Sequence, residues 1–456
     1  MKVSPRMAYS TIVCLSVGSS FASGLFRKSE FWDPSEIQSI QTFWSEPGRY
    51  TISSTNKHAV QLTVAGSQWL WDYNKKRGKG KVAPGTVAPP INTQEEVWEA
   101  WIEAKIARDR YLASVAAAAL NKPASKILPA SPDPGFPPQD MVDLFGAPPV
   151  FAAVVIPNQY QIKFDNGTVT YQDHVAMRPR YAYYRFDHGT NSGGTRISEV
   201  PEEELNGLLE NAGINKSEQK VFKAISLLEG GFDSVNTYDT GFVSVGFIQF
   251  ASLKEGGHSL GETLLQYKKE DPENFKNDFS KYGINVTTDG LLVALDIEKG
   301  DEKVGPVANS QIILDKRLIA TFQQAGKSAP YRQVQLKAAK RIYWPMSDKI
   351  APIVNGKPMP GVLSDVIKTE AGQCVFLDRK VNTGSIGTIN DCLTEIAKVK
   401  NIKNLSEFAK YEALVIRCMW YRFNPAGKTD LSQPEPCEMI PAVLEKYGRN
   451  KDTNKK

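Results

Sequence analysis

Hydrophobic and polar positions alternate with a helical period through most of the second half of the chain. One such stretch begins at Glu218 and carries four apolar residues on one face, Val221, Phe222, Ile225 and Leu228. Asn215, three residues before Glu218, has the spacing of a capping box. Gly230 and Gly231 should end the helix. The pattern therefore predicts a helix whose C-terminal end carries the carboxyl group of Glu229.

The same period predicts a helix from Glu202 onward and a series of other helices, at 94–120, 260–269, 272–282, 307–325, 330–343, 364–381 and 405–423. Thr93 is the expected N-cap of the first of these. In the helix at 364–381, Asp378 and Asn382 lie four residues apart and should share a polar face. That face either lines a cleft opposite Glu229 or is a simple solvated stripe.

Strand patterns are shorter and lie mainly before residue 200. They predict strands at 51–64, at 151–156 and at 180–186, a hairpin over 160–174 that turns at 165–167, and a second hairpin at 287–304. Residues 188–194 contain three glycines and are expected to form a flexible joint. Residues 242–250 read as a buried strand or a short apolar turn. The predicted fold class is α+β, mainly α.

Composition shifts divide the chain. Residues 1–22 resemble a secretory leader, with Lys2 and Arg6 before a short apolar stretch and a small-residue cleavage site. The remaining expected units are an N-terminal accessory region at 23–120, a Pro-rich linker at 121–149, a small β element at 150–200, a helical catalytic domain at 201–440 and a charged tail at 441–456. The aromatic residues of 23–90 either form a core or offer sugar-stacking faces, and a core is favoured.

Five cysteines occur, and Cys14 would leave with the leader. The four that remain are Cys374, Cys392, Cys418 and Cys437. An even number in an exported protein predicts two disulfides, which three pairings would satisfy. Pairing of sequence neighbours, 374 with 392 and 418 with 437, is our working hypothesis. Together with the leader, the cysteines predict a secreted or periplasmic protein.

Charge and histidine content limit the classes of partner and ligand that we expect. The net charge is +5, and removal of Lys2 and Arg6 with the leader gives 5 − 2 = +3. Lys and Arg are scattered, so no nucleic acid partner is expected. No other segment is long and apolar enough to span a membrane. The four histidines are far apart in sequence and no Cys-x-x-Cys occurs, so we expect no metal and no cofactor. A monomer is expected.

Glu229 and Asp239 are the candidate catalytic residues. Glu229 would sit at the negative end of a helix dipole beside apolar side chains, and both influences would raise its pKa toward that of a general acid. Asp239 follows on a polar loop that also carries Asp233 and Asn236. Two carboxylates in unlike surroundings are the minimum for glycosidic bond hydrolysis. The alternative is an ordinary helix end followed by an ordinary loop.

A resemblance to the lysozyme-like superfamily supports the first interpretation. The segment from Asp239 to Phe250, with Gly241 and Gly246, resembles the Asp-x-x-Gly-aromatic-x-x-Gly-x-Ile-Gly-Phe pattern of bacterial chitosanases, although Gly241 comes one place early. Gln249 resembles the Gly-x-x-Gln element of goose-type lysozymes and lytic transglycosylases. A second piece, Asp378 to Gly384, is similar to the Asp-x-x-Val-Asn-x-Gly helix end of cell-wall lysozymes. The resemblance spans roughly residues 201–440, and the gap between Glu229 and Asp239 is shorter than in chitosanases.

The resemblance implies a two-lobed, mainly helical catalytic domain that cleaves β-1,4 linkages in peptidoglycan or chitosan. It implies Glu229 as acid and Asp239 as base, with substrate contacts from Asn236, Ser244, Gln249, Asp378 and Asn382. Two alternatives stay open, a lytic transglycosylase that uses Glu229 alone and a non-catalytic wall-binding protein. A structural secreted protein with an accidental match is a third.

Overall fold

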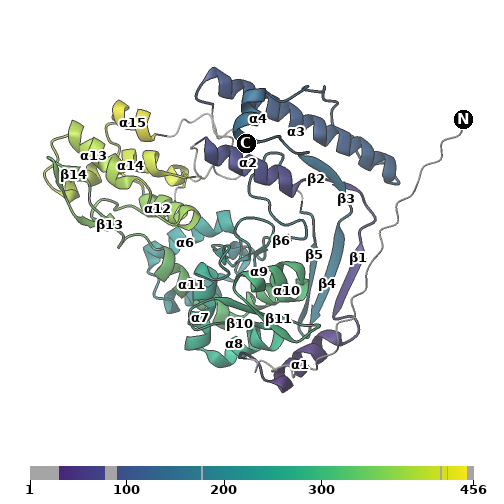
Figure 1. Cartoon of the computed structure of the whole chain (residues 1–456). Helices are drawn as coiled ribbons and strands as arrows, with labels where there is room; N and C mark the ends of the chain where they lie inside the picture. The colour runs from purple at the N-terminus through teal and green to yellow at the C-terminus, as the bar shows by residue number, and fades with distance from the viewer. Residues whose placement is uncertain (1–29, 78–89, 176–177, 422–423, 429, 449–456) are drawn as a thin grey trace, which may run out of the picture.

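The computed structural model describes residues 30–77, 90–175, 178–421, 424–428 and 430–448 (Figure 1). These residues form an α+β fold in which helices predominate and the sheets are small and antiparallel. The expected leader at 1–22 lies outside the described residues. Within the described ranges, we find no helix that combines the length and apolar character needed to cross a bilayer.

The N-terminal part is built around a three-stranded sheet in the order β1-β4-β5. Its elements are α1 (Pro34–Ser45), β1 (Tyr50–Ser54), β2 (Ala59–Leu62), α2 (Val64–Lys76), α3 (Thr93–Leu120), α4 (Gln139–Phe145), β3 (Ala152–Val155), β4 (Asn158–Phe164) and β5 (Gly167–Gln172). The predicted hairpin is confirmed, because β4 pairs with β5 and Phe164 lies opposite Gly167. Figure 1 shows these strands running from α1 at one end to α3 at the other.

The aromatic residues of this region are core residues, as favoured from sequence. Trp44 of α1 and Trp32 just before this helix are buried in the largest core. Trp69 stacks on Tyr73 of the same helix with ring centroids 5.4 Å apart, and both belong to a separate core formed by α2, α3 and α4. The predicted cap of α3 was one residue late: the side chain of Asn92, not Thr93, accepts the bond from the amide of Glu95.

The segment expected to be a linker, 121–149, lies along α3. The indole of Trp101 donates to the carbonyl of Gly135 at 3.3 Å, and Arg108 donates to the carbonyl of Ser131 at 2.8 Å. The segment also contains α4, where Met141 is fully buried. Because its side chains and carbonyls are used in the packing of α3, this segment is part of the N-terminal structure rather than a spacer.

Two predictions for residues 180–194 were wrong. The expected strand at 180–186 is absent, and only an isolated bridge joins Tyr184 to Asp239. Tyrosines favour strands, but here Tyr181 and Tyr184 are buried in the α2–α4 core instead. The expected flexible joint at 188–194 forms β6 (Asn191–Ser192), which pairs with β7 (Val235–Asn236). Thr190 is fully buried beside it.

A large central core lies below these elements. It contains the 3₁₀ turn η1 (Ile197–Glu199), α5 (Glu202–Asn211), α6 (Lys216–Glu229), β7, β8 (Ser244–Val245), β9 (Phe250–Ala251), α7 (His258–Glu270), α8 (Pro272–Asp278), η2 (Ser280–Tyr282), β10 (Ile284–Val286), β11 (Leu292–Asp296), β12 (Asp301–Val304), α9 (Pro306–Leu314), α10 (Lys316–Ala325) and α11 (Ala329–Tyr343). The predicted hairpin at 287–304 is β11 and β12, with β10 as a third strand.

One predicted helix of this core, 307–325, is broken in two. Asp315 lies between α9 and α10 and accepts a hydrogen bond from the amide of Arg317, so it caps the second helix. The Asp315 carboxylate also binds the guanidinium of Arg317 at 2.8 Å. A capping side chain in the middle of an apolar helical pattern divides it, because the cap stabilises a new helix start.

The C-terminal lobe has its own core. Its elements are β13 (Lys349–Ile350), β14 (Ile353–Val354), β15 (Lys357–Pro358), β16 (Gly361–Val362), η3 (Leu363–Asp365), α12 (Glu370–Thr383), α13 (Ile389–Val399), η4 (Leu405–Tyr411), α14 (Glu412–Met419), η5 (Pro425–Gly427) and α15 (Pro441–Tyr447). The sequence did not predict α13 or these strands. Residues 441–447 were expected to be tail but form α15, whose Val443 is fully buried; residues 449–456 lie outside the described part.

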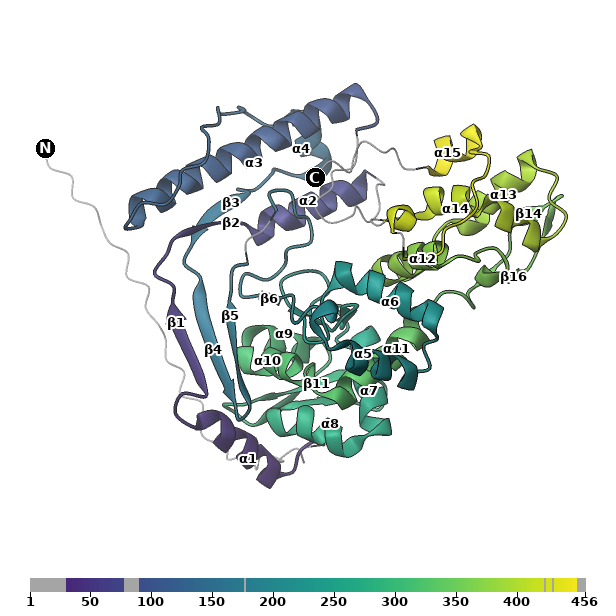
Figure 2. The same ribbon diagram turned by 180° about the vertical axis from the view of Figure 1, so that it is seen from behind.

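Helix α12 belongs to two cores at once. Its Cys374 and Leu377 pack in the central core, whereas Val375 and Phe376 pack in the C-terminal core. Trp344, just after α11, also contacts both cores. Figure 2 shows α12 between α6 on one side and α13 and α14 on the other.

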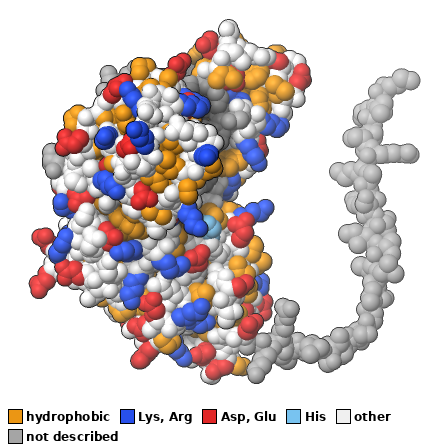
Figure 3. Space-filling view, turned by 90° about the vertical axis from the view of Figure 1, so that its left-hand side faces the viewer, with side chains coloured by type: hydrophobic (Ala, Val, Ile, Leu, Met, Phe, Trp, Pro, Cys, Tyr) orange, Lys and Arg blue, Asp and Glu red, His pale blue; other side chains and the backbone are white. Residues whose placement is uncertain are grey.

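The outline of the molecule is hollowed at one edge between an upper and a lower part, and acidic and basic side chains intermingle over this face (Figure 3).

Candidate active site

Helix α6 positions Glu229 as predicted, at its last residue. The Asn215 side chain accepts from the amide of Glu218 at 3.0 Å and the Glu218 carboxylate accepts from the amide of Asn215 at 2.9 Å, so the predicted capping box is present. Gly230 ends the helix with a φ of 144°. One detail differs: Val221, Phe222 and Ile225 are buried, but Leu228 is 38% exposed, so the apolar face does not reach the end of the helix.

The surroundings of Glu229 include Tyr343 at the end of α11. Burial, together with the neighbouring Glu229 carboxylate, raises the pKa of Tyr343 to about 12, although a bond with Ser259 works in the other direction. The Tyr343 ring lies 6.1 Å from the ring of Phe250 on β9. Glu229 is half-buried. The charge of Glu229 therefore acts on the phenol of Tyr343, which stays protonated.

The glycines after Glu229 are required by close contacts. A Cβ on Gly231 would lie 1.7 Å from the carbonyl oxygen of Thr195, and one on Gly230 would lie 2.7 Å from Oγ of Ser234. The amide of Gly231 donates to the carbonyl of Gly193 at 3.0 Å. The loop after the helix is thus pressed against residues 193–195, which hold it in place.

Asp233 braces this loop. Its carboxylate accepts from the amide of Thr195 at 2.7 Å and from the Thr195 hydroxyl at 3.2 Å, and its side chain is buried. Gly194 and Gly326 leave room for it, because a Cβ on either would lie within about 2.5 Å of Asp233 atoms. These contacts suit a bracing role for Asp233 rather than a role in holding water.

Gln249 lies near the same end of the site. Its amide donates to Oγ of Ser234 at 2.7 Å and to the carbonyl of Gly246 at 3.1 Å, while the Ser234 hydroxyl donates to Gly246. Ser234 in turn touches Gly230. The hydroxyl of Ser234 therefore lies between Gln249 and Gly230, the residue that follows Glu229. Its backbone φ of 52° marks a tight turn between β8 and β9.

Asp239 occupies the loop between β7 and β8. Its Oδ1 accepts from the amide of Gly241 at 2.9 Å, and its Oδ2 accepts from the Asn236 amide at 3.0 Å and the Tyr181 hydroxyl at 3.1 Å. Burial, and the nearby charge of Asp239, raise the pKa of Tyr181 far above its usual range, so this hydroxyl stays protonated. The amide of Arg185 donates to the carbonyl of Tyr238 and anchors the loop from outside.

The loops that carry Asp239 and follow Glu229 meet the small sheet at different ends. In β7 and β8, Asn236 lies opposite Ser244, and these residues adjoin the loop that carries Asp239. Ser234, in the loop that follows Glu229, precedes the other end of β7 and accepts a hydrogen bond from Gln249. At roughly 3.3 Å per residue, the two steps from Ser234 to Asn236 span about 6.6 Å.

The predicted contacts from the facing helix are only partly available. Helix α12 packs on α6 as expected. Asp378 is fully buried, however, and accepts from the side-chain amide of Asn382 at 3.2 Å. A buried carboxylate that braces its own helix is not placed to contact a sugar, so this assignment is corrected. Ser244 is also buried, whereas Asn382 is half-buried.

The four cysteines are free thiols, and their placement does not match the neighbour pairing. Cys374 lies in the central core and Cys392 in the C-terminal core. Cys392 instead contacts Cys418 across the packing of α13 on α14. The contact with the Cys418 thiol and burial both raise the pKa of Cys392.

We therefore expect oxidation to form one disulfide, between Cys392 and Cys418, and to leave Cys374 and Cys437 as thiols. A bridge there should stabilise the C-terminal lobe by roughly 2–4 kcal/mol. Peptide mapping and thiol counting of oxidised protein check this. The Cys374→Ser variant is the control and should keep the bridge. Two bridges between sequence neighbours would contradict the expected pairing.

Sequence reasoning missed several residues of the site. Tyr181 was assigned to a strand, although it donates to Asp239. Thr195 and Tyr343 were not singled out, because each is brought to the site by a distant element, and Ser234 in the loop after Glu229 was overlooked. The only local signal was the Gly pair after Glu229, which indicates a close backbone approach but does not say to what.

Comparisons of this chain with protein-family models, with curated proteins and with solved structures found no match. The interpretation of the site therefore rests on its own residues and geometry.

Proposed function

We propose that this protein cleaves β-1,4 linkages in an amino-sugar polymer, peptidoglycan or chitosan, with Glu229 as the general acid. The observation that carries the proposal is the position of Glu229. It is the last residue of α6, it leads directly into the antiparallel strands β7, β8 and β9, and α12 packs against its helix. A half-buried carboxyl group at the end of a helix that leads into a small sheet, with its charge acting on a protonated tyrosine, is suited to proton transfer.

In the proposed reaction, the carboxyl group of Glu229 gives its proton to the leaving glycosidic oxygen. Asp239 accepts a proton from water on the other side of the sugar ring, which gives inversion when the carboxyl groups are roughly 6.5–9.5 Å apart. Asp239 lies on the loop at one end of the small sheet and the loop that follows Glu229 enters the other end, which supports this division of roles. Gln249 and Asn236 would contact substrate or water from the two ends.

The proposal includes export from the cytoplasm, because the substrate is a wall polymer. It rests on the leader-like segment 1–22 and on the mild positive charge, which suits an anionic wall. A monomer fits the proposal, since the candidate acid and base come from one chain.

One observation favours a second candidate, a lytic transglycosylase. Both oxygens of Asp239 are occupied by hydrogen bonds from Tyr181, Asn236 and Gly241. Oxygens that already accept hydrogen bonds leave fewer lone pairs to face a water molecule. In that case Asp239 shapes the loop, and Glu229 alone acts as acid and then base with assistance from the N-acetyl group of the substrate.

Product analysis tests the proposal. The mature protein is incubated with purified peptidoglycan and with chitosan, and the fragments are identified by mass spectrometry. Hydrolysis yields reducing ends and adds one water per cut, whereas a transglycosylase yields anhydro ends. Intact polymer in both incubations would contradict both candidate activities, and the Glu229→Gln variant is the background control.

A further inference from the structure

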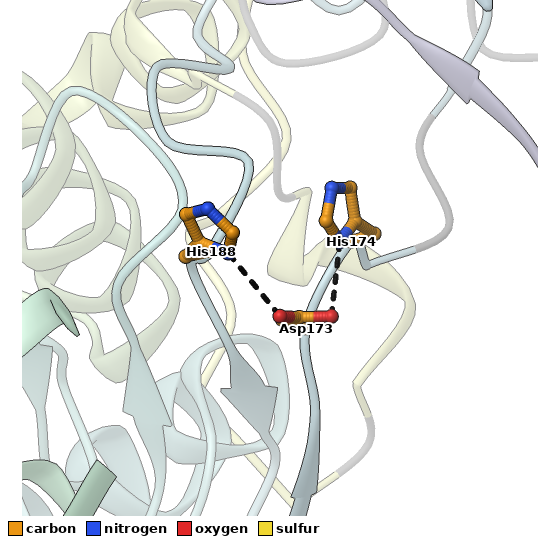
Figure 4. A group of neighbouring side chains, drawn as sticks. All are labelled: Asp173, His174 and His188. Carbon is orange, nitrogen blue, oxygen red and sulfur yellow. Dashed lines mark hydrogen bonds and ion pairs between the residues drawn. The ribbon is translucent and has the colours of Figure 1, made fainter. Parts of the chain in front are cut away.

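Asp173, His174 and His188 form a cluster outside the candidate active site. Asp173 and His174 follow β5, and His188 precedes β6. One oxygen of the carboxylate and one nitrogen of each imidazole lie within 4.8 Å of one another. Figure 4 shows the two rings on the same side of the carboxylate, one over each oxygen. Nδ1 of His174 is 2.9 Å from Oδ1, and Nδ1 of His188 is 3.3 Å from Oδ2.

The carboxylate of Asp173 is fixed from behind. Asp173 is fully buried, its Oδ1 accepts from the amide of Asn158 at 2.7 Å, and its Oδ2 accepts from the hydroxyl of Tyr160 at 2.8 Å. Its orientation is set by contacts that do not depend on the histidines.

The two histidines are also held by the backbone around them. The amide of His174 donates to the carbonyl of Asp187 at 3.0 Å, which joins the chain segments that carry the two rings. The hydroxyl of Tyr184 donates to Asp187 at 3.0 Å. The side chain of His174 is 12% exposed and that of His188 is 52% exposed, so solvent reaches the cluster from one side. The segments that carry the two histidines are therefore held in place, and the cluster is accessible to solvent.

We propose that Asp173, His174 and His188 bind one divalent transition-metal ion of the Zn²⁺ class, which ties the end of β5 to the segment before β6. Two imidazole nitrogens and one carboxylate oxygen are a donor set that Zn²⁺ uses, with water as the fourth ligand of a tetrahedron. Ligand atoms about 2.0–2.1 Å from such an ion are about 3.3 Å apart. The separations of 2.9 and 3.3 Å run to different oxygens of Asp173, and the three donor atoms lie within 4.8 Å of one another, so the two imidazoles would have to close on the ion.

Outer contacts of the kind that support metal ligands are already present. Asn158 and Tyr160 hold the carboxylate, as the hydrogen-bond partners of ligands do in metal sites. Lys316 is the nearby cation: its ammonium group lies 5.3 Å from the ring centroid of Tyr160 and donates to the carbonyl of Ile313.

The position of the cluster gives the ion a structural role. The segment from His188 back to Tyr181 carries the hydroxyl group that donates to Asp239. Sequence analysis predicted no metal because the histidines are far apart in sequence. Folding of β5 against the segment before β6 brings two of them to one carboxylate. A metal ion there would hold that segment against the central core.

The test uses full-length mature protein purified without a polyhistidine tag. After removal of metals with a chelator, Zn²⁺ and Mg²⁺ are titrated separately by calorimetry, and bound metal is counted by mass spectrometry after dialysis. We expect one Zn²⁺ per chain, a melting temperature that rises with Zn²⁺ concentration, and no binding of Mg²⁺, which prefers oxygen ligands. Failure of wild-type protein to retain Zn²⁺ would overturn the proposal.

Variants locate the ion. His188→Ala removes the more exposed ligand and should weaken Zn²⁺ binding by at least about tenfold, since loss of even an outer-shell partner costs 10–100-fold. His188→Gln should show the same loss and guards against a folding defect in the alanine variant. His258→Asn is the matched control, because His258 is exposed at the start of α7 with a φ of 45°, which asparagine tolerates. Equal Zn²⁺ binding in wild type and both His188 variants would place the ion elsewhere.

Discussion

Glu229→Gln should lower turnover on the cleaved polymer by roughly 10²–10⁴-fold, the usual contribution of general acid catalysis. Glutamine keeps the size and hydrogen-bonding reach of glutamate but has no proton to transfer. Glu229 is half-buried at the last residue of α6, where the glycine contacts with Thr195 and Ser234 fix the following loop without its help. The melting temperature should therefore change little.

The matched control is Glu270→Gln. Glu270 is also the last residue of its helix, α7, but it pairs with Lys337 on the surface. Surface ion pairs contribute at most about 1 kcal/mol, so this variant should keep its stability and full turnover. Initial rates and thermal unfolding of the three proteins are measured side by side. Unaltered turnover in Glu229→Gln would remove the acid from the mechanism and with it the proposed function.

Replacement of Asp239 by asparagine should lower turnover, whereas replacement of Asp233 by asparagine should lower stability. Asp239→Asn should reduce turnover by roughly 10²–10⁴-fold with stability nearly intact, if Asp239 is the base. Asn can still accept from the amide of Gly241, so the loop between β7 and β8 keeps its main anchor. Asp233→Asn should instead destabilise the protein by about 1–3 kcal/mol, because a buried, charge-assisted bond to Thr195 is weakened.

Turnover and chemical denaturation of both variants decide between three outcomes. The expected pattern assigns the base to Asp239. The reverse pattern moves the base to Asp233, despite its two bonds to Thr195. If neither variant loses turnover while Glu229→Gln does, the single-acid transglycosylase becomes the better assignment, and the three hydrogen bonds to Asp239 are then structural.

Sequence patterns predicted what depends on near neighbours. The capping box of Asn215 and Glu218, the stop at Gly230 and the hairpin turn at 165–167 each involve residues a few positions apart, and each is present. The strand expected at 180–186 failed because tertiary burial of Tyr181 and Tyr184 in the α2–α4 core replaced pairing. Propensity is a weak guide where a distant core offers a larger apolar contact.

The candidate site shows the same division. Glu229 and the two glycines were predicted from a local pattern. Tyr343 reaches the site from α11, more than a hundred residues away, and nothing in its own neighbourhood marks it. Asp378 was chosen for its spacing from Asn382. Spacing predicts which face of a helix a residue lies on, but it does not predict whether that face is buried, and Asp378 is fully buried. The pairing of Cys392 with Cys418 likewise depends on how α13 meets α14.

Helix α12, with side chains in both the central and the C-terminal core, limits how the lobes can move. A hinge needs a few residues that few contacts cross, but here Leu377 and Phe376 are adjacent in sequence and buried in different cores. Rotation of one lobe about the other would pull one of them out of its packing. We therefore expect any movement between the lobes to occur as a small sliding of α12 on α6.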